Sequence, residues 1–183
     1  MLKTDLSRYD NSWWDPGHRI GIWLWYLVNP LTINTYLPFP VALKRWILRR
    51  FGAKIGKNVI IKPKVNIKSP WFLTIDDNVW IGECVWIDNL TNVSIGANAC
   101  LSQGAMLLTG NHDFTKTTFD LQTKEIHLAE GVWIGAQAVV CPGVTCYSHA
   151  VLTVNSVATK PLEAYCIYQG NPAVFVKQRI INS

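Results

Sequence analysis

Ile55-Gly56-Lys57-Asn58-Val59 recurs 20 residues later as Ile75-Asp76-Asp77-Asn78-Val79 and again as Ile95-Gly96-Ala97-Asn98-Ala99. Within these blocks the period falls to six, and one aliphatic residue opens each hexad. A helix would need a period of 3.6 and a flat strand a period of 2, so neither element alone explains the pattern. A short strand followed by a turn does. The series of hexad-opening residues, interrupted once, is Ile55, Ile61, Ile67, Ile75, Ile81, Ile87, Ile95, Leu101, Leu107, Leu128, Ile134, Val140, Cys146 and Leu152.

A turn position lies three residues into each hexad, just before a second residue that is usually small or β-branched. Asn and Gly tolerate positive φ, so a chain turns there at low energetic cost. Eight of the 14 hexads carry Asn or Gly at this place: Asn58, Asn78, Asn98, Gly104, Gly110, Gly131, Gly143 and Asn155. Three hexads then close one triangular coil, and stacked coils bury a continuous aliphatic column. We expect between four and five coils with parallel strands.

Two segments lie outside the repeat. Residues 1–52 are rich in aromatic residues, and 19–28 and 40–51 are typical of two short helices, with Pro40 opening the second. We expect them to cap the open end of the solenoid in residues 53–160, followed by a C-terminal tail in 161–183. A membrane-surface or partner-docking face is the alternative, because three aromatic residues, Trp23, Trp25 and Tyr26, would lie beside three arginines, Arg45, Arg49 and Arg50. The second segment, about 109–126, is an inserted loop of the kind that often carries function.

Composition excludes several classes of protein. The chain has 183 residues, 49% hydrophobic and 16% charged, and no apolar run of membrane-spanning length or secretory signal, so we expect one cytoplasmic domain. The net charge of +5 is modest and no nucleic-acid module is recognisable. The five cysteines form no CxxC pair, which favours neither disulfides nor zinc, and we expect them to be small core residues.

His112 is the strongest candidate for a catalytic residue. It lies where the regular coil gives way to the inserted loop, and histidine is the usual general base near neutral pH. On the residues alone, a hydrogen-bonded structural histidine is the alternative interpretation.

The hexads resemble those of the left-handed β-helix acyltransferases, and the resemblance, not the period, supplies the expected handedness. Four stretches are similar to galactoside and maltose O-acetyltransferases: 131–136 (GVWIGA), 141–145 (CPGVT), 156–160 (SVATK) and 170–173 (GNPA). The Trp-rich N-terminus and the junction 51–56 (FGAKIG) look closer to the colanic-acid-type acetyltransferases of exopolysaccharide synthesis. The expected fold is therefore an all-β, left-handed parallel β-helix with a short helical cap and one inserted loop.

The resemblance implies an acetyl-CoA-dependent O-acetyltransferase that acts on a sugar hydroxyl and works as a homotrimer without a metal. His112 would be the base. Asp88, with Asn89 beside it, stands where the similar enzymes have an acceptor-binding Asn, and this departure leaves open a role in orienting the hydroxyl or the histidine, or a solvated corner pair. The resemblance places acetyl-CoA against six residues, which are alternatively plain surface positions: Trp133, Ala136, Val154, Thr159, Lys160 and Lys177.

Two other functions fit parts of the pattern. A zinc-dependent γ-type carbonic anhydrase uses the same scaffold, but His112, His127 and His149 are spaced 15 and 22 residues apart, without a near-pair of ligands. A catalytically inactive β-helix scaffold or interaction subunit is compatible with the change at Asp88. The loop histidine and the GNPA tail favour the enzyme. Peripheral association with the inner face of a membrane stays open.

Overall fold

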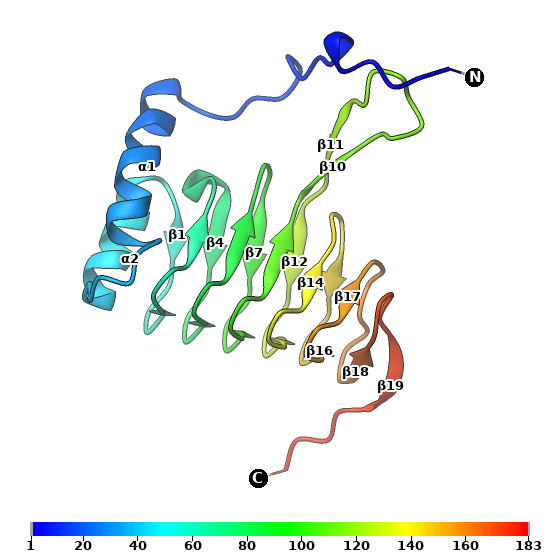
Figure 1. The fold of residues 1–183 in the computed structure, drawn as a ribbon. Coiled ribbons are helices and arrows are strands. Elements are labelled where there is room, and N and C mark those ends of the chain that lie inside the picture. The colour runs from blue at the N-terminus through cyan, green and yellow to red at the C-terminus, as the bar shows by residue number, and fades with distance from the viewer. Residues whose placement is uncertain (1, 183) are drawn as a thin grey trace.

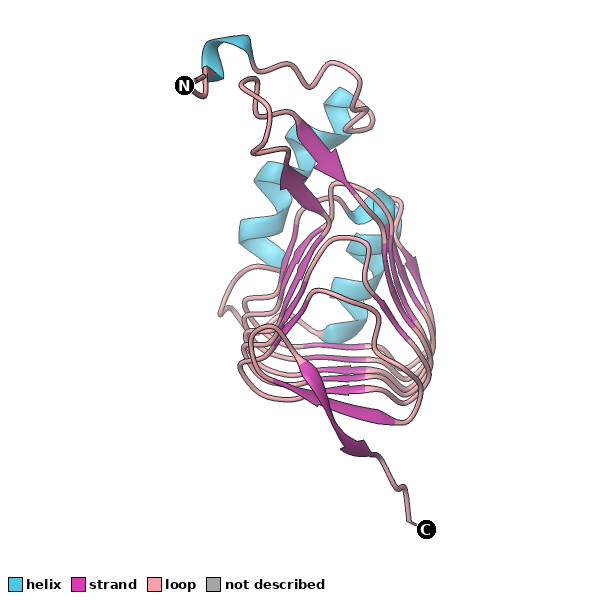
Figure 2. Ribbon diagram, turned by 90° about the vertical axis from the view of Figure 1, so that its right-hand side faces the viewer, coloured by secondary structure: helices cyan, strands magenta, loops and turns pink. Residues whose placement is uncertain are grey.

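The computed structural model describes residues 2–182 and is a left-handed parallel β-helix, as the resemblance implied. Three flat parallel sheets form the sides of a triangular prism, which Figure 2 shows end-on and Figure 1 from the side. Within the described residues, no helix combines the length and the apolar character needed to cross a membrane.

Each coil contributes one short strand to each side of the prism. Sheet A contains β1 (Lys54–Ile55), β4 (Leu73–Ile75), β7 (Val93–Ile95), β12 (Ile126–Leu128) and β15 (Thr145–Cys146). Sheet B contains β2 (Ile60–Ile61), β5 (Trp80–Ile81), β8 (Cys100–Leu101), β13 (Trp133–Ile134), β16 (Val151–Leu152), β18 (Cys166–Gln169) and the antiparallel edge strand β19 (Val174–Gln178). Sheet C contains β3 (Asn66–Ile67), β6 (Trp86–Asp88), β9 (Met106–Leu108), β14 (Val139–Val140) and β17 (Val157–Ala158).

The structure confirms the core that the sixfold pattern predicts. All 14 hexad-opening residues are at most 8% exposed, and neighbouring coils stack them in register, Ile61 on Ile81 and Ile81 on Leu101. Eleven of the 14 residues four positions later are buried as well, at 2% exposure or less. The solenoid is longer than the four to five coils expected, because β18 extends sheet B to six parallel strands beyond the last regular hexad.

The corners show why Asn and Gly predicted only part of the turns. Seven of the eight predicted turn residues have positive φ, but Gly110 lies in a strand of the inserted hairpin and does not. Lys64, Cys84, Gln137 and His149 adopt the same left-handed backbone, with φ between 55° and 61°. Stacking of the coils therefore imposes this conformation even on residues that do not favour it.

Two helices cover the N-terminal end of the prism, as expected (Figure 1). The first, α1 (Arg19–Thr32), runs past the predicted end at Val28 and contains Pro30, and α2 (Val41–Arg50) is slightly shorter than predicted. Trp25 is 2% exposed and its Nε1 donates to the carbonyl of Ile67 at 2.8 Å. α1 is thus fixed to the prism through its inner face. The division of the chain at residues 52 and 160 stays a prediction.

The cysteines match the expectation of core positions only in part, since Cys100 and Cys141 are half-buried. Cys146 and Cys166 are buried and free, and burial raises the pKa of the Cys146 thiol to about 12. Cys84 is exposed at a corner, where it approaches the Tyr36 hydroxyl at 3.8 Å, so the prediction of a core position is wrong for this residue. The hexad places a turn there, and turns point outward.

Candidate active site

The inserted segment forms a β-hairpin that rises from the corner between sheets C and A, here called the hairpin corner. It consists of β10 (Gly110–His112) and β11 (Leu121–Thr123), paired antiparallel with His112 opposite Leu121. The chain leaves sheet C at Leu108 and returns to sheet A at Ile126. His112 therefore lies on a paired strand of the hairpin, and Figure 2 shows this hairpin projecting from the prism.

The ring of His112 is held in one orientation by neighbours from the hairpin. Its Nδ1 lies 3.0 Å from the carbonyl oxygen of Phe119, and the two rings stack with centroids 4.4 Å apart and planes at 7°. A carbonyl only accepts, so Nδ1 carries the proton of the neutral imidazole, and the tautomer is assigned from this partner. Nε2 is then left with a free lone pair, which is what a general base requires.

Ion pairs and hydrogen bonds fix the tip of the hairpin. Lys116 lies 3.0 Å from Asp120 and 3.9 Å from Asp113. The hydrogen bond from Thr115 lowers the pKa of the Asp113 carboxyl, and hydrogen bonds from Thr118 and then Lys116 lower the pKa of Asp120. These contacts are exposed and each stabilises the tip only slightly. Together they define the loop that presents Phe119 to His112.

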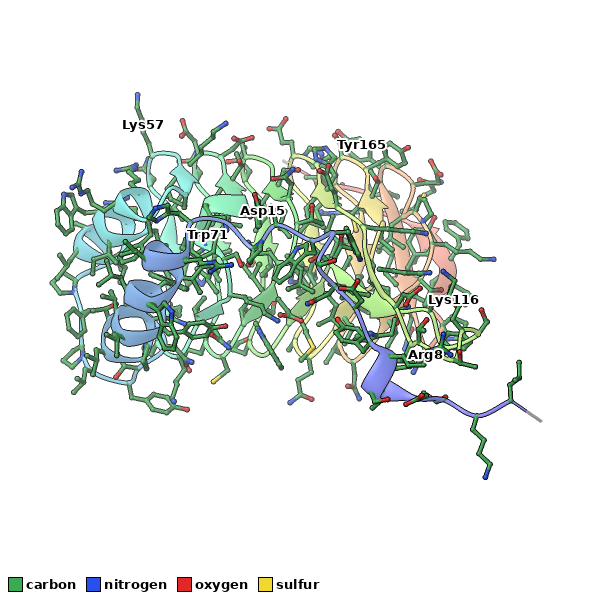
Figure 3. The ribbon with its side chains drawn as sticks, turned by 90° about the horizontal axis from the view of Figure 1, so that it is seen from above. Arg8, Asp15, Lys57, Trp71, Lys116 and Tyr165 are labelled. Carbon is green, nitrogen blue, oxygen red and sulfur yellow. The ribbon has the colours of Figure 1, made fainter. Side chains whose placement is uncertain are left out.

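The extreme N-terminal segment also reaches the hairpin, which the sequence did not predict. Asp5 N donates to the carbonyl of Thr117 at 2.8 Å, and the Tyr9 ring lies 5.8 Å from that of His112. Trp14 Nε1 donates to the Leu90 carbonyl at 2.8 Å. Figures 1 and 3 show the segment running over the coils from α1 toward the hairpin, with Arg8 near Lys116. The aromatic composition of the segment was the only available signal.

Thr109 anchors the foot of the hairpin. It is fully buried, its Oγ1 accepts from Leu90 N at 2.7 Å, and the same hydroxyl donates to the Asp88 carbonyl at 3.1 Å. Its own carbonyl accepts from Lys124 N at 2.9 Å, which closes the base of the hairpin. One hydroxyl thus joins the coil before the insertion to the strand that carries His112.

We predict that Thr109→Val lowers kcat/KM about tenfold and stability by about 1–3 kcal/mol, because the buried Leu90 N loses its acceptor and the Asp88 carbonyl keeps only one of its two donors, Thr109 N. Steady-state kinetics and chemical denaturation measure the two effects. Thr109→Ser, which keeps the hydroxyl, is the matched control and should stay close to wild type. Wild-type kinetics in the valine variant would show that the hydroxyl does not position the hairpin.

Asp88 and Asn89 differ sharply in their surroundings. Asn89 is fully buried, and its side chain exchanges two hydrogen bonds with the backbone of Ser69 in the preceding coil, at 2.6 and 3.0 Å. Asp88 lies at the end of β6 and forms an ion pair with Lys68 at 2.9 Å. Among the described residues neither side chain is hydrogen-bonded to His112. Asn89 therefore holds two coils together, whereas Asp88 is partly open to solvent at the hairpin corner.

The six residues expected to bind acetyl-CoA fall into two groups, one at the hairpin corner and one on sheet B and its corner with sheet C. Thr159 and Lys160 follow β17 and share the hairpin corner with His112; Thr159 and Asn111 line one pocket of about 280 Å³. Ala136 and Val154 stack in neighbouring coils at the corner between sheets B and C. Trp133 is 47% exposed on sheet B, with its Nε1 donating to Ser102 Oγ, and Lys177 lies on the edge strand β19 of the same sheet. A single prism does not bring the two groups together.

The remaining coil histidines lie elsewhere. His127 Nδ1 is 2.6 Å from Ser94 Oγ on the outside of sheet A, and the His149 ring stacks on Tyr165 at 4.7 Å. In residues 2–182 no three side chains of the His, Cys, Asp or Glu type gather as a metal-binding group. The structure does not bring the three imidazoles of the carbonic anhydrase alternative together.

Comparison with known proteins gives the relationship. The chain is 39% identical over 167 residues to the colanic acid biosynthesis acetyltransferase WcaF of Escherichia coli (strain K12), covering 90% of each chain. The hexapeptide-repeat acetyltransferase VCA0836 of Vibrio cholerae, solved with acetyl coenzyme A, superposes with a TM-score of 0.77 at 20% identity, over 89% of this chain and 87% of that one. A galactoside acetyltransferase solved with coenzyme A gives 0.75 at 22% identity, over 87% and 78%.

No family model matches the sequence. The identity to WcaF over nearly the whole length is nevertheless decisive, and the two solved structures share the fold. With its sixfold repeat, its prism and its hairpin histidine, the chain belongs to the hexapeptide-repeat acetyltransferase family.

Proposed function

We propose that the enzyme transfers an acetyl group from acetyl-CoA to a sugar hydroxyl in the synthesis of an exopolysaccharide or cell-surface glycan. The observation that carries the proposal is the orientation of His112, whose Nδ1 is bound to the Phe119 carbonyl and whose Nε2 has no hydrogen-bond partner among the described residues. The relative WcaF is named for colanic acid biosynthesis, and the relative from Vibrio cholerae was solved with acetyl coenzyme A. The first name points to a glycan acceptor, and the second structure points to this donor.

The reaction follows from one proton and one acyl transfer. Nε2 of His112 accepts the proton of the acceptor hydroxyl as its oxygen attacks the thioester carbonyl of acetyl-CoA. The C–S bond breaks, CoA leaves as a thiolate, and the imidazolium returns the proton to the sulfur. The Phe119 carbonyl oxygen stabilises the imidazolium formed in between, because it still accepts the Nδ1 hydrogen bond when the ring is positively charged. Asp88, one coil away at the same corner, is proposed to bind the acceptor.

We propose a homotrimer as the working assembly, on the ground of the outward residues of each sheet. Sheet A presents polar residues outward, such as Thr74, Ser94 and Thr145. Sheets B and C present mainly apolar ones, among them Trp80, Trp133, Trp86, Met106 and Val139. Packing sheet C of one copy against sheet B of the next covers both surfaces in a closed ring.

Such a ring would also complete the acetyl-CoA groove. The hairpin corner of one copy, with Thr159 and Lys160, would face Trp133 and Lys177 on sheet B of a second copy. In this arrangement the aromatic ring packs on the pantetheine arm and the lysines pair with the nucleotide phosphates, while Ala136 and Val154 lie at the inner end of the same interface. The division of the six residues into two groups supports this proposal, because one prism alone offers only half of the groove.

We further infer that the enzyme works at the inner, cytoplasmic face of a membrane, since the helical end of the prism is both apolar and positively charged.

The test of the function is acceptor profiling with labelled acetyl-CoA across mono- and oligosaccharides, with sedimentation analysis of the same preparation. We expect label in an O-acetyl ester of a sugar, CoA released in equal amount, and a mass of three chains. An active monomer would refute the shared groove. A pure trimer that transfers no label to any sugar would favour the inactive scaffold.

A further inference from the structure

The outer surface of α1 is apolar along its whole length. Its exposed residues recur at the spacing of one helical stripe, and each is between 50% and 74% exposed. Apart from Arg19 at its first position the helix carries no charge. We call this stripe the outer face of α1, and it consists of Ile20, Trp23, Leu24, Leu27 and Leu31.

The opposite side of the same helix is already in use. Trp25 is buried and bound to Ile67, and Asn29 Nδ2 donates to Asn66 Oδ1 at 3.0 Å. These contacts hold α1 to the first coil, so the helix cannot turn its outer face inward. The five large apolar side chains of the outer face therefore stay in contact with solvent. Monomeric proteins rarely leave such a contiguous patch exposed without a binding role.

The basic residues of the chain are concentrated at the same end of the molecule. Between residues 16 and 75 the sequence has no Asp or Glu, while the rest of the chain contains all 12 of them. This acid-free region holds ten of the 17 basic residues: Arg19, Lys44, Arg45, Arg49, Arg50, Lys54, Lys57, Lys62, Lys64 and Lys68. In the described part of the chain only one of them, Lys68, has an acidic partner.

Two contacts place cations directly beside the apolar surface. Leu24 of the outer face and Arg50 of α2 line the same largely apolar pocket of about 540 Å³ between the helices. Lys64 Nζ lies 5.5 Å from the ring centre of the exposed Tyr36, in the loop that joins α1 to α2. Lys44, by contrast, is buried and donates to backbone carbonyls, and its burial lowers its pKa. Charge and apolar surface are therefore contiguous at this end.

We propose that the outer face of α1, with Arg19 and Arg50 beside it, docks on an anionic phospholipid membrane. Trp, Leu and Ile side chains enter the boundary between headgroups and acyl chains, and basic residues pair with the headgroup phosphates. Docking of a second copy through the same face is disfavoured, because a twofold contact would bring two acid-free basic surfaces together. A negatively charged lipid surface can bind both parts of this region, the apolar side chains through its acyl chains and the basic residues through its phosphates.

The test uses the full chain and vesicles, either of phosphatidylcholine alone or with about a third of phosphatidylglycerol. We expect co-sedimentation with the anionic vesicles only, weakening as salt is raised. Trp23→Glu combined with Leu27→Glu should reduce partitioning at least tenfold. Arg19→Gln and Arg50→Gln should each reduce it about fivefold, and they leave the apolar stripe intact should the double variant fold poorly. The matched control is Ile180→Glu in the C-terminal tail, where the side chain is 81% exposed, and it should bind like wild type.

Three results would overturn the proposal: no binding to anionic vesicles, equal loss in the Ile180 control, or a smaller assembly of the double variant in lipid-free buffer. The last would assign the face to a second copy. The proposal rests on the membrane location proposed above but not on acetyl transfer, so membrane binding and acetyl transfer can fail separately. The folded double variant should still acetylate a water-soluble acceptor at the wild-type rate, whereas an enzyme inactive on every sugar could still bind the vesicles.

Discussion

His112→Ala is expected to lower kcat/KM for acetyl transfer by about 10²- to 10⁴-fold, the usual contribution of a general base. The ring is half-buried between Phe119 and Tyr9, and its Nδ1 is occupied by the Phe119 carbonyl. Alanine therefore removes the one free nitrogen that can accept the proton of the acceptor. The measurement is CoA release from acetyl-CoA at saturating acceptor, on a variant with wild-type circular dichroism and sedimentation.

The matched control is His127→Ala. This imidazole lies outside sheet A and is bonded to Ser94, away from the hairpin, so its removal should leave the rate within about twofold of wild type. A fully active His112→Ala enzyme would show that another group accepts the proton. Equal losses in the two variants would point to a general effect of removing a histidine, and the assignment of the base would fail.

Most of the fold was predictable because one physical rule repeats through it. Every hexad needs an aliphatic residue inward, a small residue inward and a corner, so a period of six carries the strand order and the core. What the period does not contain is longer-range stacking. Lys64 and His149 turn with positive φ in register with the corners of adjacent coils, at Cys84 and Gly131, and β18 joins sheet B without a hexad of its own.

The site was predictable only in part, for the same reason. The hairpin and the position of His112 follow from the break in the repeat, and the resemblance gave its role. The contact of Tyr9 with His112 spans more than a hundred residues of sequence and leaves no periodic trace. The burial of Asn89 was likewise invisible, because an Asn at a corner is normally solvated, whereas here it satisfies the backbone of Ser69. Contacts between segments that are distant in the sequence can be identified only in the structure.

Gly96→Ala is expected to destabilise the protein by about 3 kcal/mol, at the upper end of the effects of overpacking. Gly96 follows the core residue Ile95, and a Cβ built on it would lie 2.7 Å from both Ala129 C and Glu130 N of the next coil. Backbone atoms on both sides are held by the parallel ladder of β7 and β12, so neither coil can move aside locally. The added methyl group must therefore push the two coils apart. Urea denaturation measures the resulting loss in the free energy of unfolding.

Gly21→Ala provides a control of opposite sign. Gly21 lies in α1, and a Cβ there meets nothing within 4 Å, so the substitution should raise stability by about 0.5–1 kcal/mol through helix propensity alone. If both variants are stabilised, the coils tolerate a wider spacing than the ladder allows, and glycine after the hexad-opening residue would be a matter of chance. If only Gly96→Ala is destabilised, close approach of the coils explains why the repeat also places glycine after Ile55, Ile81 and Ile134.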